Sequence, residues 1–265
     1  MLNGKKIIVV LPAYNAEKTL KTTYEKISKD IVDDIILIDD FSSDNTVSIA
    51  KELNITTILH EKNMGYGANQ KTCYAAALQA NADIVIMLHP DYQYSPELIP
   101  AMAAMLAYGK YDAVIASRML TGNALKNGMP FYKWISNKFL TSFENLFTKA
   151  NLSEYHSGYR GFTKKVLEKL PLDSCNNDFI FDNEMLALII YYNFKIGEIS
   201  CPAKYFPEAS SINFIRSCKY GIGVLAVSLL FALAKTNIFK SKIFKKDAKK
   251  LKTDKVLNYQ YKSII

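Results

Sequence analysis

Short apolar runs alternate with longer amphipathic segments through the first half of the chain. The runs consist mainly of aliphatic residues and show no polar alternation, which is typical of strands that are covered on both faces. They predict strands over 6–11, 34–38, 55–59, 83–88 and 112–117. The intervening segments carry apolar residues at helical spacing and predict helices over 16–29, 43–53, 67–80 and 96–108. Because such alternation forms βαβ units, we expect an α/β fold, in which a mostly parallel sheet has helices on both faces.

The second half of the chain is less regular and contains two long apolar segments. Residues 129–148 form a strongly aromatic, amphipathic stretch that also carries lysines. Such a stretch usually packs in a core, but it is also typical of a helix that lies on a membrane surface. Residues 220–234 form a run of 15 residues without a charge, which is short of the ~20 residues that span a bilayer. We therefore expect the second segment to lie at a membrane surface or to pack on the domain.

The basic charge of the chain is concentrated near its C-terminus. The formal net charge is +8, and between residues 235 and 255 nine lysines face only two aspartates. The rest of the chain is close to neutral, so we expect no nucleic acid partner. An apolar helix and a Lys-rich tail are together two modest signals for an anionic membrane surface. We predict a main domain over 1–212 and a membrane-associated unit over 213–265; the alternative is a terminal helix packed on the domain, followed by a solvated tail.

Composition narrows the class of protein only broadly. With 265 residues, of which 49% are hydrophobic and 22% charged, the chain is typical of a globular protein. Its four cysteines include no CxxC pair, which argues against a zinc knuckle or a disulfide framework and fits a reducing compartment. The apolar run near the N-terminus is too short for a signal peptide. We expect a cytoplasmic protein, bound peripherally at the inner face of the cell membrane.

Polar side chains follow each predicted strand. The first strand leads to 12–17, the second to Asp39 and Asp40, the third to a turn that contains Gly65, and the fifth to Arg118. The carboxyl ends of parallel strands share one edge of the sheet, where open α/β sheets bind ligands. The two acids could accept hydrogen bonds from a base or a ribose, and the arginine could neutralise a phosphate. A nucleoside diphosphate derivative fits this set.

The fourth strand ends in a turn with the ligands of a divalent cation. His89, Asp91 and Gln93 follow one another at two-residue spacing, so an extended turn can direct all three side chains at one ion. Oxygen and imidazole ligands suit Mn²⁺ or Mg²⁺, and Zn²⁺ is also possible. The alternative is a polar turn in which Asp91 caps the helix that follows.

Four motifs in order resemble the family 2 glycosyltransferases. They are Pro-Ala-Tyr-Asn at 12–15, Asp-Asp-x-Ser-x-Asp-x-Thr at 39–46, an Asp-x-Asp-like turn at 89–91 and Ser-Gly-Tyr-Arg-Gly-Phe at 157–162. The resemblance spans roughly residues 5–225 and is greatest to the dolichyl/polyprenyl-phosphate sugar synthases. It implies a Rossmann-like GT-A fold, a nucleotide-sugar donor, a divalent metal and an inverting reaction.

The resemblance also implies roles for single residues. Asp39 and Asp40 match the nucleoside-binding acids, and three residues of the first loop match the segment around the base: Pro12, Tyr14 and Glu17. We include Asn15 of the same loop and Gly65 among the donor-binding candidates. Asp91 matches the second acid of the Asp-x-Asp turn, and Gln93 the amide two residues later.

The first acid of that turn is replaced by His89. A neutral imidazole can still coordinate Mn²⁺, but the site loses one negative charge. The metal affinity should fall and become pH-dependent near the imidazole pKa of roughly 6.5. The alternative is that His89 only hydrogen-bonds a neighbouring loop and that Asp91 holds the metal alone.

The acceptor side depends on residues of the second half. Arg160 could bind a donor or acceptor phosphate, or could be a structural ion-pair partner. Asp182 and Glu184 begin a predicted helix, and in the family an acid near this point is the general base for hydroxyl acceptors. Being two residues apart, only one of the pair can face the site from a regular helix. A phosphate acceptor is already anionic and needs no base, so the acids favour neither acceptor.

These observations lead to one main prediction and two alternatives. We predict an inverting hexosyltransferase of family 2 that moves a sugar from a UDP- or GDP-sugar to polyprenyl phosphate, in cell-envelope glycan biosynthesis. The first alternative is transfer to a hydroxyl of a glycan or lipid. The second is a non-catalytic, membrane-associated adaptor whose metal site is degenerate at His89.

Overall fold

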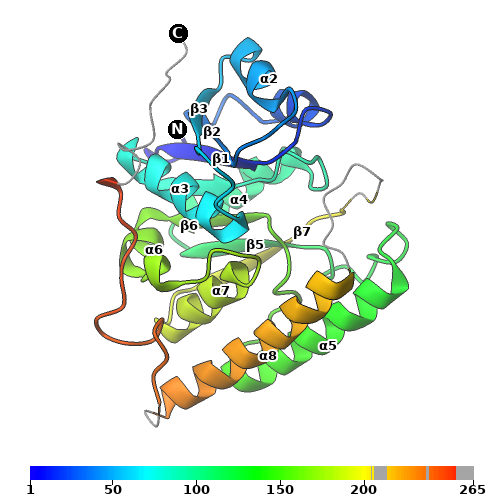
Figure 1. Cartoon of the computed structure of the whole chain (residues 1–265), viewed down its shortest axis with the longest axis vertical. Coiled ribbons are helices and arrows are strands. Elements are labelled where there is room, and N and C mark those ends of the chain that lie inside the picture. Colours follow the sequence, from blue (N-terminus) through cyan, green and yellow to red (C-terminus); the bar gives the residue numbers. More distant parts are fainter. Residues whose placement is uncertain (204, 206–213, 237–238, 255–265) are drawn as a thin grey trace.

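The fold is built around one seven-stranded sheet (Figure 1). The computed structural model describes residues 1–203, 205, 214–236 and 239–254. The strand order is β3-β2-β1-β4-β6-β5-β7, and only β6 runs antiparallel to its neighbours. The strands are β1 (Ile7–Ala13), β2 (Asp34–Asp39), β3 (Thr56–Leu59), β4 (Ile84–Met87), β5 (Ala113–Ser117), β6 (Arg160–Thr163) and β7 (Ile196–Ser200). The predicted fold class, a mostly parallel sheet with helices, is confirmed.

Helices cover both faces of this sheet. The α-helices are α1 (Leu20–Glu25), α2 (Thr46–Glu52), α3 (Tyr66–Gln79), α4 (Ile99–Ala107), α5 (Phe131–Thr148), α6 (Lys164–Lys169), α7 (Phe181–Tyr191) and α8 (Phe214–Lys235). Two short 3₁₀ helices are η1 (Pro96–Leu98) and η2 (Leu172–Ser174). Successive residues of the strands point to opposite faces, so Ile8 and Val10 pack with α3 and α7, whereas Ile7 and Val9 pack with α1 and α4.

Two local features differ from the predicted elements. The helix predicted over 16–29 is reduced to α1. The residues before it are tied to the neighbouring loop, because the backbone amides of Ala16 and Glu17 donate hydrogen bonds to Thr46 Oγ1 and Asp44 Oδ2. Strands β6 and β7 were not predicted; β6 has only four residues, which include an arginine and a glycine and show no strand pattern. Gly161 is needed there: an added Cβ would lie 2.9 Å from a methyl group of Leu106.

The helices α5 and α8 lie side by side at one end of the molecule, away from α2 (Figure 1). Each buries one face and leaves large apolar side chains in contact with solvent. On α5 these include Phe139 and Leu146, which are 60% and 72% exposed, and on α8 they include Ile222, which is 69% exposed. We call this set the apolar helix face; its other members are Phe131, Tyr132, Ile135, Leu229 and Leu233.

Helix α8 is longer than the uncharged run in the sequence predicts. A stretch of 20 residues, Arg216–Lys235, is by length and composition apolar enough to cross a membrane, and 28% of its 18-residue apolar window is buried within the protein. The sequence argument that this segment is too short was therefore wrong. It counted only uncharged residues, whereas Arg216, Lys219 and Lys235 belong to the helix and stand near its ends.

The described part of the Lys-rich tail packs against the domain. In Figure 1 it runs from the end of α8 along the molecule toward α3. Ile243 and Phe244 are buried, and the ring of Phe244 lies 4.9 Å from that of Tyr191 between centroids. Further along, Ser174 Oγ accepts a hydrogen bond from the amide of Lys249. Residues 255–265 of the predicted tail lie outside the described residues, and the domain boundary at 212 stays a prediction.

Phe244→Ala should lower the free energy of unfolding by about 3 kcal/mol, because a buried aromatic ring is replaced by a cavity. Lys245→Ala, at the exposed neighbouring position, is the matched control and should change it by less than about 0.5 kcal/mol. Urea denaturation of the full-length protein measures both values. Equal midpoints for the two variants would mean that this segment does not stay packed.

Candidate functional site

The carboxyl ends of β1 to β5 lie along one edge of the sheet, as their predicted parallel arrangement requires. β1 pairs in parallel with both β2 and β4, and β3 pairs in parallel with β2. β4 and β5 both run antiparallel to β6, so they point the same way. Pro12 is buried within β1 opposite Ile38, and Asp39 is the last residue of β2. The other donor-binding and metal candidates follow the strand ends, whereas Arg160 begins β6, and Asp182 and Glu184 lie in α7.

The loops after β1 and β2 are bound to each other. Asn15 Oδ1 accepts a hydrogen bond from the amide of Ser43 at 2.9 Å, and Glu17 Oε2 accepts one from the amide of Asn45 at 3.0 Å. These two predicted donor-binding residues therefore shape the loops through their carbonyl and carboxylate oxygens. Tyr14 differs from them, because its side chain is 57% exposed at the sheet edge. Its ring is accessible to a ligand.

Asp39 ends β2 with one oxygen paired and one unpaired. Its Oδ2 accepts a hydrogen bond from the amide of Ser42 at 2.9 Å. Its Oδ1 is buried and has no hydrogen-bond partner among the residues that the structure describes. Burial raises the pKa of Asp39 above its usual range. An unpartnered buried acceptor costs free energy, so this oxygen is suited to receive a hydrogen bond from a ligand.

Asp40 instead holds the turn after β3. Its carboxylate lies 2.7 Å from Nδ1 of His60 and accepts hydrogen bonds from the amides of Met64 and Gly65. Gly65 has a φ of +95°, and an added Cβ would lie 2.7 Å from the carbonyl oxygen of Asn177. Asp40 and Gly65 are thus brought together, and both make their contacts with other residues of the protein.

The turn after β4 is connected to α3 and α7 through Tyr66. The Tyr66 hydroxyl donates to Asp182 Oδ2 at 2.8 Å, and Nε2 of His89 lies 3.1 Å from the same hydroxyl oxygen. Because the hydroxyl proton is already donated, Nε2 of His89 must carry the proton of this second bond. The lone pair of the imidazole is then on Nδ1. Burial lowers the pKa of His89, which favours this neutral form.

Asp91 and Gln93 are half-buried in the same turn. Asp91 Oδ1 accepts a hydrogen bond from the backbone amide of Gln93 at 3.1 Å. The alternative in which Asp91 caps the next helix does not hold, because the helical segment begins at Pro96 with Ser95 as its N-cap. In the part of the chain that the structure describes, no group of three His, Cys, Asp or Glu side chains could hold a metal ion.

The two candidate arginines occupy different environments. Arg118 forms an ion pair with the fully buried carboxylate of Glu154, and its Nη2 also donates to the carbonyl of His156 at 3.0 Å. Although burial opposes it, the Arg118 guanidinium holds the pKa of Glu154 below its usual range. The Arg118 side chain remains 13% exposed. It can therefore still approach an anionic ligand.

Arg160 is completely buried. Its guanidinium donates to three backbone carbonyls, those of Tyr155, Ser157 and Asp182, at 2.7–2.8 Å. It also lies 3.5 Å from the Asp182 carboxylate. The sequence left two roles open for Arg160. The structure shows the structural ion pair, and a fully buried guanidinium with these partners is not available to bind a phosphate directly.

The acids at the start of α7 point to different neighbours. Asp182 accepts hydrogen bonds from Tyr66 and from Gln70 Nε2, so it belongs to the group around His89. Glu184 Oε2 accepts from the amide of Asn176, and burial raises the pKa of Glu184. Their contacts differ as the two-residue spacing along a helix requires.

Sequence reasoning missed three residues that organise the site: Tyr66, His60 and Glu154. Tyr66 connects the turn after β4 with α7, His60 pairs with Asp40, and Glu154 pairs with Arg118. The position of Tyr66 at the first turn of a helix after a strand end was the available signal. His60 and Glu154 have no comparable local signal, because their partners are distant in the sequence.

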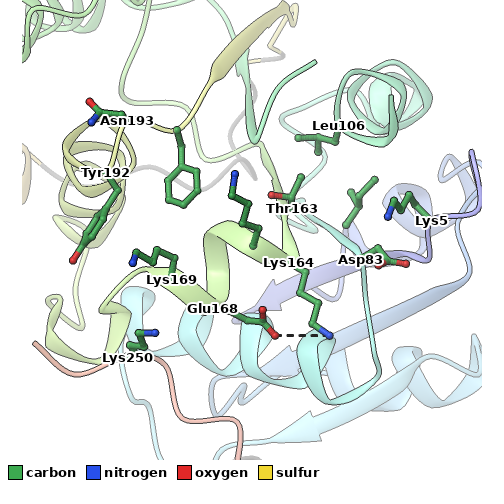
Figure 2. A pocket seen from close by; sticks show the side chains of 13 residues that line it. Lys5, Asp83, Leu106, Thr163, Lys164, Glu168, Lys169, Tyr192, Asn193 and Lys250 are labelled. Carbon is green, nitrogen blue, oxygen red and sulfur yellow. Dashed lines mark ion pairs between the residues drawn. The ribbon is translucent and has the colours of Figure 1, made fainter. Parts of the chain in front are cut away.

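A cavity of about 750 Å³ lies at the other edge of the sheet (Figure 2). Its lining includes Lys5 and Asp83, which precede β1 and β4, and Thr163, which ends the antiparallel β6. These positions mark the amino-terminal edge of the parallel strands. The cavity is therefore separate from the strand ends that carry the candidate site residues.

The sequence is similar to archaeal glycosyltransferases. It is 28% identical over 218 residues to a UDP-N-acetylglucosamine–dolichyl-phosphate N-acetylglucosaminyltransferase of Methanococcus voltae, covering 76% of this chain and 86% of that protein. It is 29% identical over 212 residues to a low-salt glycan biosynthesis hexosyltransferase of Haloferax volcanii, covering 77% of this chain and 49% of that protein. These similarities agree with the predicted polyprenyl-phosphate sugar synthase branch.

The fold is similar to that of a solved enzyme, and the sequence matches a family profile. Glucosyl-3-phosphoglycerate synthase from Mycobacterium tuberculosis, in complex with Mn²⁺, UDP and glucosyl-3-phosphoglycerate, superposes with a TM-score of 0.66. The superposition covers 86% of this chain and 80% of that chain at 17% identity, so it shows the fold alone. The profile of glycosyl transferase family 2 matches residues 8–171, more than half of the chain. The chain therefore belongs to glycosyl transferase family 2.

Proposed function

We propose that the protein transfers a sugar from a nucleotide-diphosphate sugar to polyprenyl phosphate at the inner face of the cell membrane, with inversion at the anomeric carbon. The observation that carries the proposal is the unpartnered Oδ1 of Asp39. It lies at the carboxyl edge of the sheet, one strand from the exposed Tyr14 ring and two strands from the turn of Asp91. This oxygen would accept a hydrogen bond from an N–H group of a base or from a hydroxyl of a ribose.

The turn after β4 has a donor set that suits a divalent metal. The Asp91 carboxylate, the Gln93 amide oxygen and the Nδ1 lone pair of His89 would hold the ion, with the bond from Nε2–H to Tyr66 fixing the tautomer. Mn²⁺ and Mg²⁺ are commonly held by one or two carboxylates together with substrate phosphates. When bound, the ion neutralises charge on the diphosphate leaving group. UDP complexes of the Mycobacterium tuberculosis enzyme contain Mn²⁺ or Mg²⁺, which supports this assignment.

A phosphate acceptor agrees with the state of the acids near the site. Asp182 is engaged by Tyr66, Gln70 and Arg160, and Glu184 accepts a hydrogen bond from the amide of Asn176. The contacts of both acids are within the protein, and a phosphate acceptor needs no base. The Methanococcus voltae relative is named for a dolichyl phosphate acceptor, which supports the same class here.

Two cations at the ends of β5 and the beginning of α5 are suited to the acceptor phosphate. Burial lowers the pKa of Lys133, and the positive charge of Arg118 lowers it further. Two neighbouring cations repel, and an anion between them relieves that repulsion. Lys133 also begins the helix that carries the apolar helix face. A lipid phosphate would then meet cations beside an apolar surface.

The apolar helix face is proposed to lie on the membrane. Its exposed side chains come from both α5 and α8, and lysines such as Lys138 and Lys149 lie on the exposed surface of α5 or just after it. Apolar side chains with flanking lysines are typical of helices at an anionic lipid surface. This arrangement keeps the protein peripheral, since one face of α8 is packed on α5 and α7.

Donor binding tests the first part of the proposal. In calorimetry with Mn²⁺, either UDP or GDP should bind, and Asp91→Ala should weaken that binding at least about tenfold because a charged metal ligand is lost. Asp39→Ala should weaken it as well. Asp30→Ala is the control, since Asp30 is exposed and precedes the amino-terminal end of β2, opposite the end that carries Asp39. Absence of metal-dependent binding to either nucleotide would favour the adaptor alternative.

Asp182→Asn and Glu184→Gln should each retain at least about a third of the turnover with polyprenyl phosphate, because an anionic acceptor needs no base. Initial rates measure this, and thermal unfolding midpoints show whether the ion pair with Arg160 still supports the fold. A loss of a hundredfold or more in a stably folded variant would indicate a hydroxyl acceptor with that residue as its base.

The double substitution Phe139→Ser and Leu146→Ser should reduce co-sedimentation with anionic vesicles at least about tenfold, since each buried apolar side chain contributes about 1.5–3 kcal/mol. Tyr108→Ser removes a ring that is 60% exposed at the end of α4 and is the matched control. Both variants keep the core residues of the C-terminal segment, which a deletion would remove. Equal binding by the two variants would exclude this face as the membrane contact.

A further inference from the structure

Four polar side chains, buried or half-buried, form a ring of contacts behind the candidate site. Asn183 Nδ2 donates to Glu144 Oε1 at 2.8 Å, and the Tyr220 hydroxyl donates to Asn183 Oδ1 at 2.6 Å. Nδ1 of His156 lies 2.9 Å from the Tyr220 oxygen, and Nε2 of His156 lies 3.4 Å from Glu144 Oε2. The ring connects α5, α7 and α8 with the segment that precedes β6.

If Glu144 is ionised, the four side chains have too few donor protons to make a hydrogen bond at each of the four contacts. Tyr220 has one O–H, neutral His156 has one N–H, and Asn183 directs its amide group to one neighbour and its oxygen to the other. These three donors serve three of the four contacts. The fourth pairs Glu144 Oε2 with His156 Nε2, and neither atom has a hydrogen-bond partner in the described part of the chain. If Asn183 is flipped, the count is unchanged, so the ring needs one more proton.

The surroundings of the ring decide where this proton resides. The side chains of His156 and Glu144 are 8% and 4% exposed, so a charged pair would lose most of its hydration. Burial raises the pKa of Glu144 to about 8 and lowers that of His156 to about 4. The ionisable groups around the pair are Arg160 on β6, Arg118 after β5, Asp182 on α7, and Glu154 and Tyr155 in the preceding segment. Glu154 favours a charged His156 and the two arginines oppose it, while Arg160 favours an ionised Glu144, so burial is the effect that decides the protonation of the pair.

We propose that Glu144 is an uncharged carboxylic acid whose proton closes the ring on Nε2 of His156, and that the closed ring positions the α5–α8 pair against the candidate site. Two contacts connect the ring to that site. The carbonyl of His156 accepts from Arg118, and Asn183 is adjacent to Asp182, whose carbonyl accepts from Arg160. Glu144 and Tyr220 lie on the two helices of the apolar helix face.

The proposal predicts how stability depends on pH. The carboxyl of an unfolded Glu ionises near pH 4.3, whereas Glu144 in the native protein stays protonated to about pH 8. Up to about pH 6.5 this proton is balanced by His156, which is protonated in the unfolded state but neutral in the native protein, because burial lowers its pKa to about 4. Between about pH 6.5 and pH 8 the native state binds more protons than the unfolded state, so raising the pH lowers the stability. Above the native pKa, Glu144 ionises opposite the lone pair of His156 and the ring opens.

Glu144→Gln keeps a hydrogen-bond donor at this position but cannot ionise. Its amide N–H₂ can donate to Nε2 of His156 while its oxygen accepts from Asn183, so the ring stays closed at every pH. Thermal unfolding of the full-length protein between pH 5 and pH 9 should show a decline in midpoint for the wild type relative to Glu144→Gln. Glu144→Ala should have the lowest midpoint at pH 6. The exposed Glu168→Gln should follow the wild-type curve and is the matched control.

A second measurement is the pH dependence of turnover, which rests on the proposed function. The turnover of the wild type should fall at least about fivefold from pH 7 to pH 9 relative to Glu144→Gln, which should retain the wild-type rate at pH 7. A merely structural role would leave the two pH profiles parallel.

Parallel unfolding curves for the wild type and Glu144→Gln, or a Glu144→Gln midpoint as low as that of Glu144→Ala, would overturn the uncharged Glu144. Because unfolding needs no substrate, these results do not depend on the proposed transferase activity. If the wild type and all variants show no turnover but the unfolding curves are as expected, the transferase is rejected and the proton assignment remains.

Discussion

The buried cation of Arg160 constrains the whole candidate site. A guanidinium cannot lose its proton in a protein, and an unpaired buried charge costs several kcal/mol. Three carbonyls and the Asp182 carboxylate therefore have to gather around it. Since Asp182 also accepts from Tyr66 and Gln70, the first turns of α3 and α7 are held together. The orientation of His89 follows from Tyr66, so the turn after β4 depends on a residue of the antiparallel strand.

The polar residues at the sheet edge divide into two groups. Asp40 and Glu154 have their oxygens paired with His60, Arg118 and backbone amides, and they shape loops. Asp39 differs, because one of its buried oxygens has no partner in the described chain. Residues with internal partners are costly to redirect toward a ligand, whereas an unpaired acceptor favours binding. The donor proposal therefore depends on Asp39 and on the turn of Asp91 more than on the neighbouring acids.

The helix pair α5–α8 joins two surfaces with different requirements. Its outer side exposes aromatic and aliphatic side chains, and its inner side contributes Glu144 and Tyr220 to a buried polar ring. Buried polar groups must be fully satisfied, so the ring fixes how the helices meet the domain. In the proposed function, a lipid acceptor approaches along the outer side while its phosphate reaches the cations near Arg118. In the proposed ring, protonation of Glu144 is a condition for the geometry on both sides of the pair.

The sequence by itself determined the alternating strands and helices, the shared edge of the strand ends and the family. These depend on local periodicity and short motifs, which act within one element or turn. The tertiary structure decided which acids are paired, where β6 inserts and how Arg160 is used. Tyr66 and Asp182 are 116 residues apart, and Glu144 and Asn183 are 39 apart. Because such contacts form only when distant segments pack together, no local pattern in the sequence specifies them.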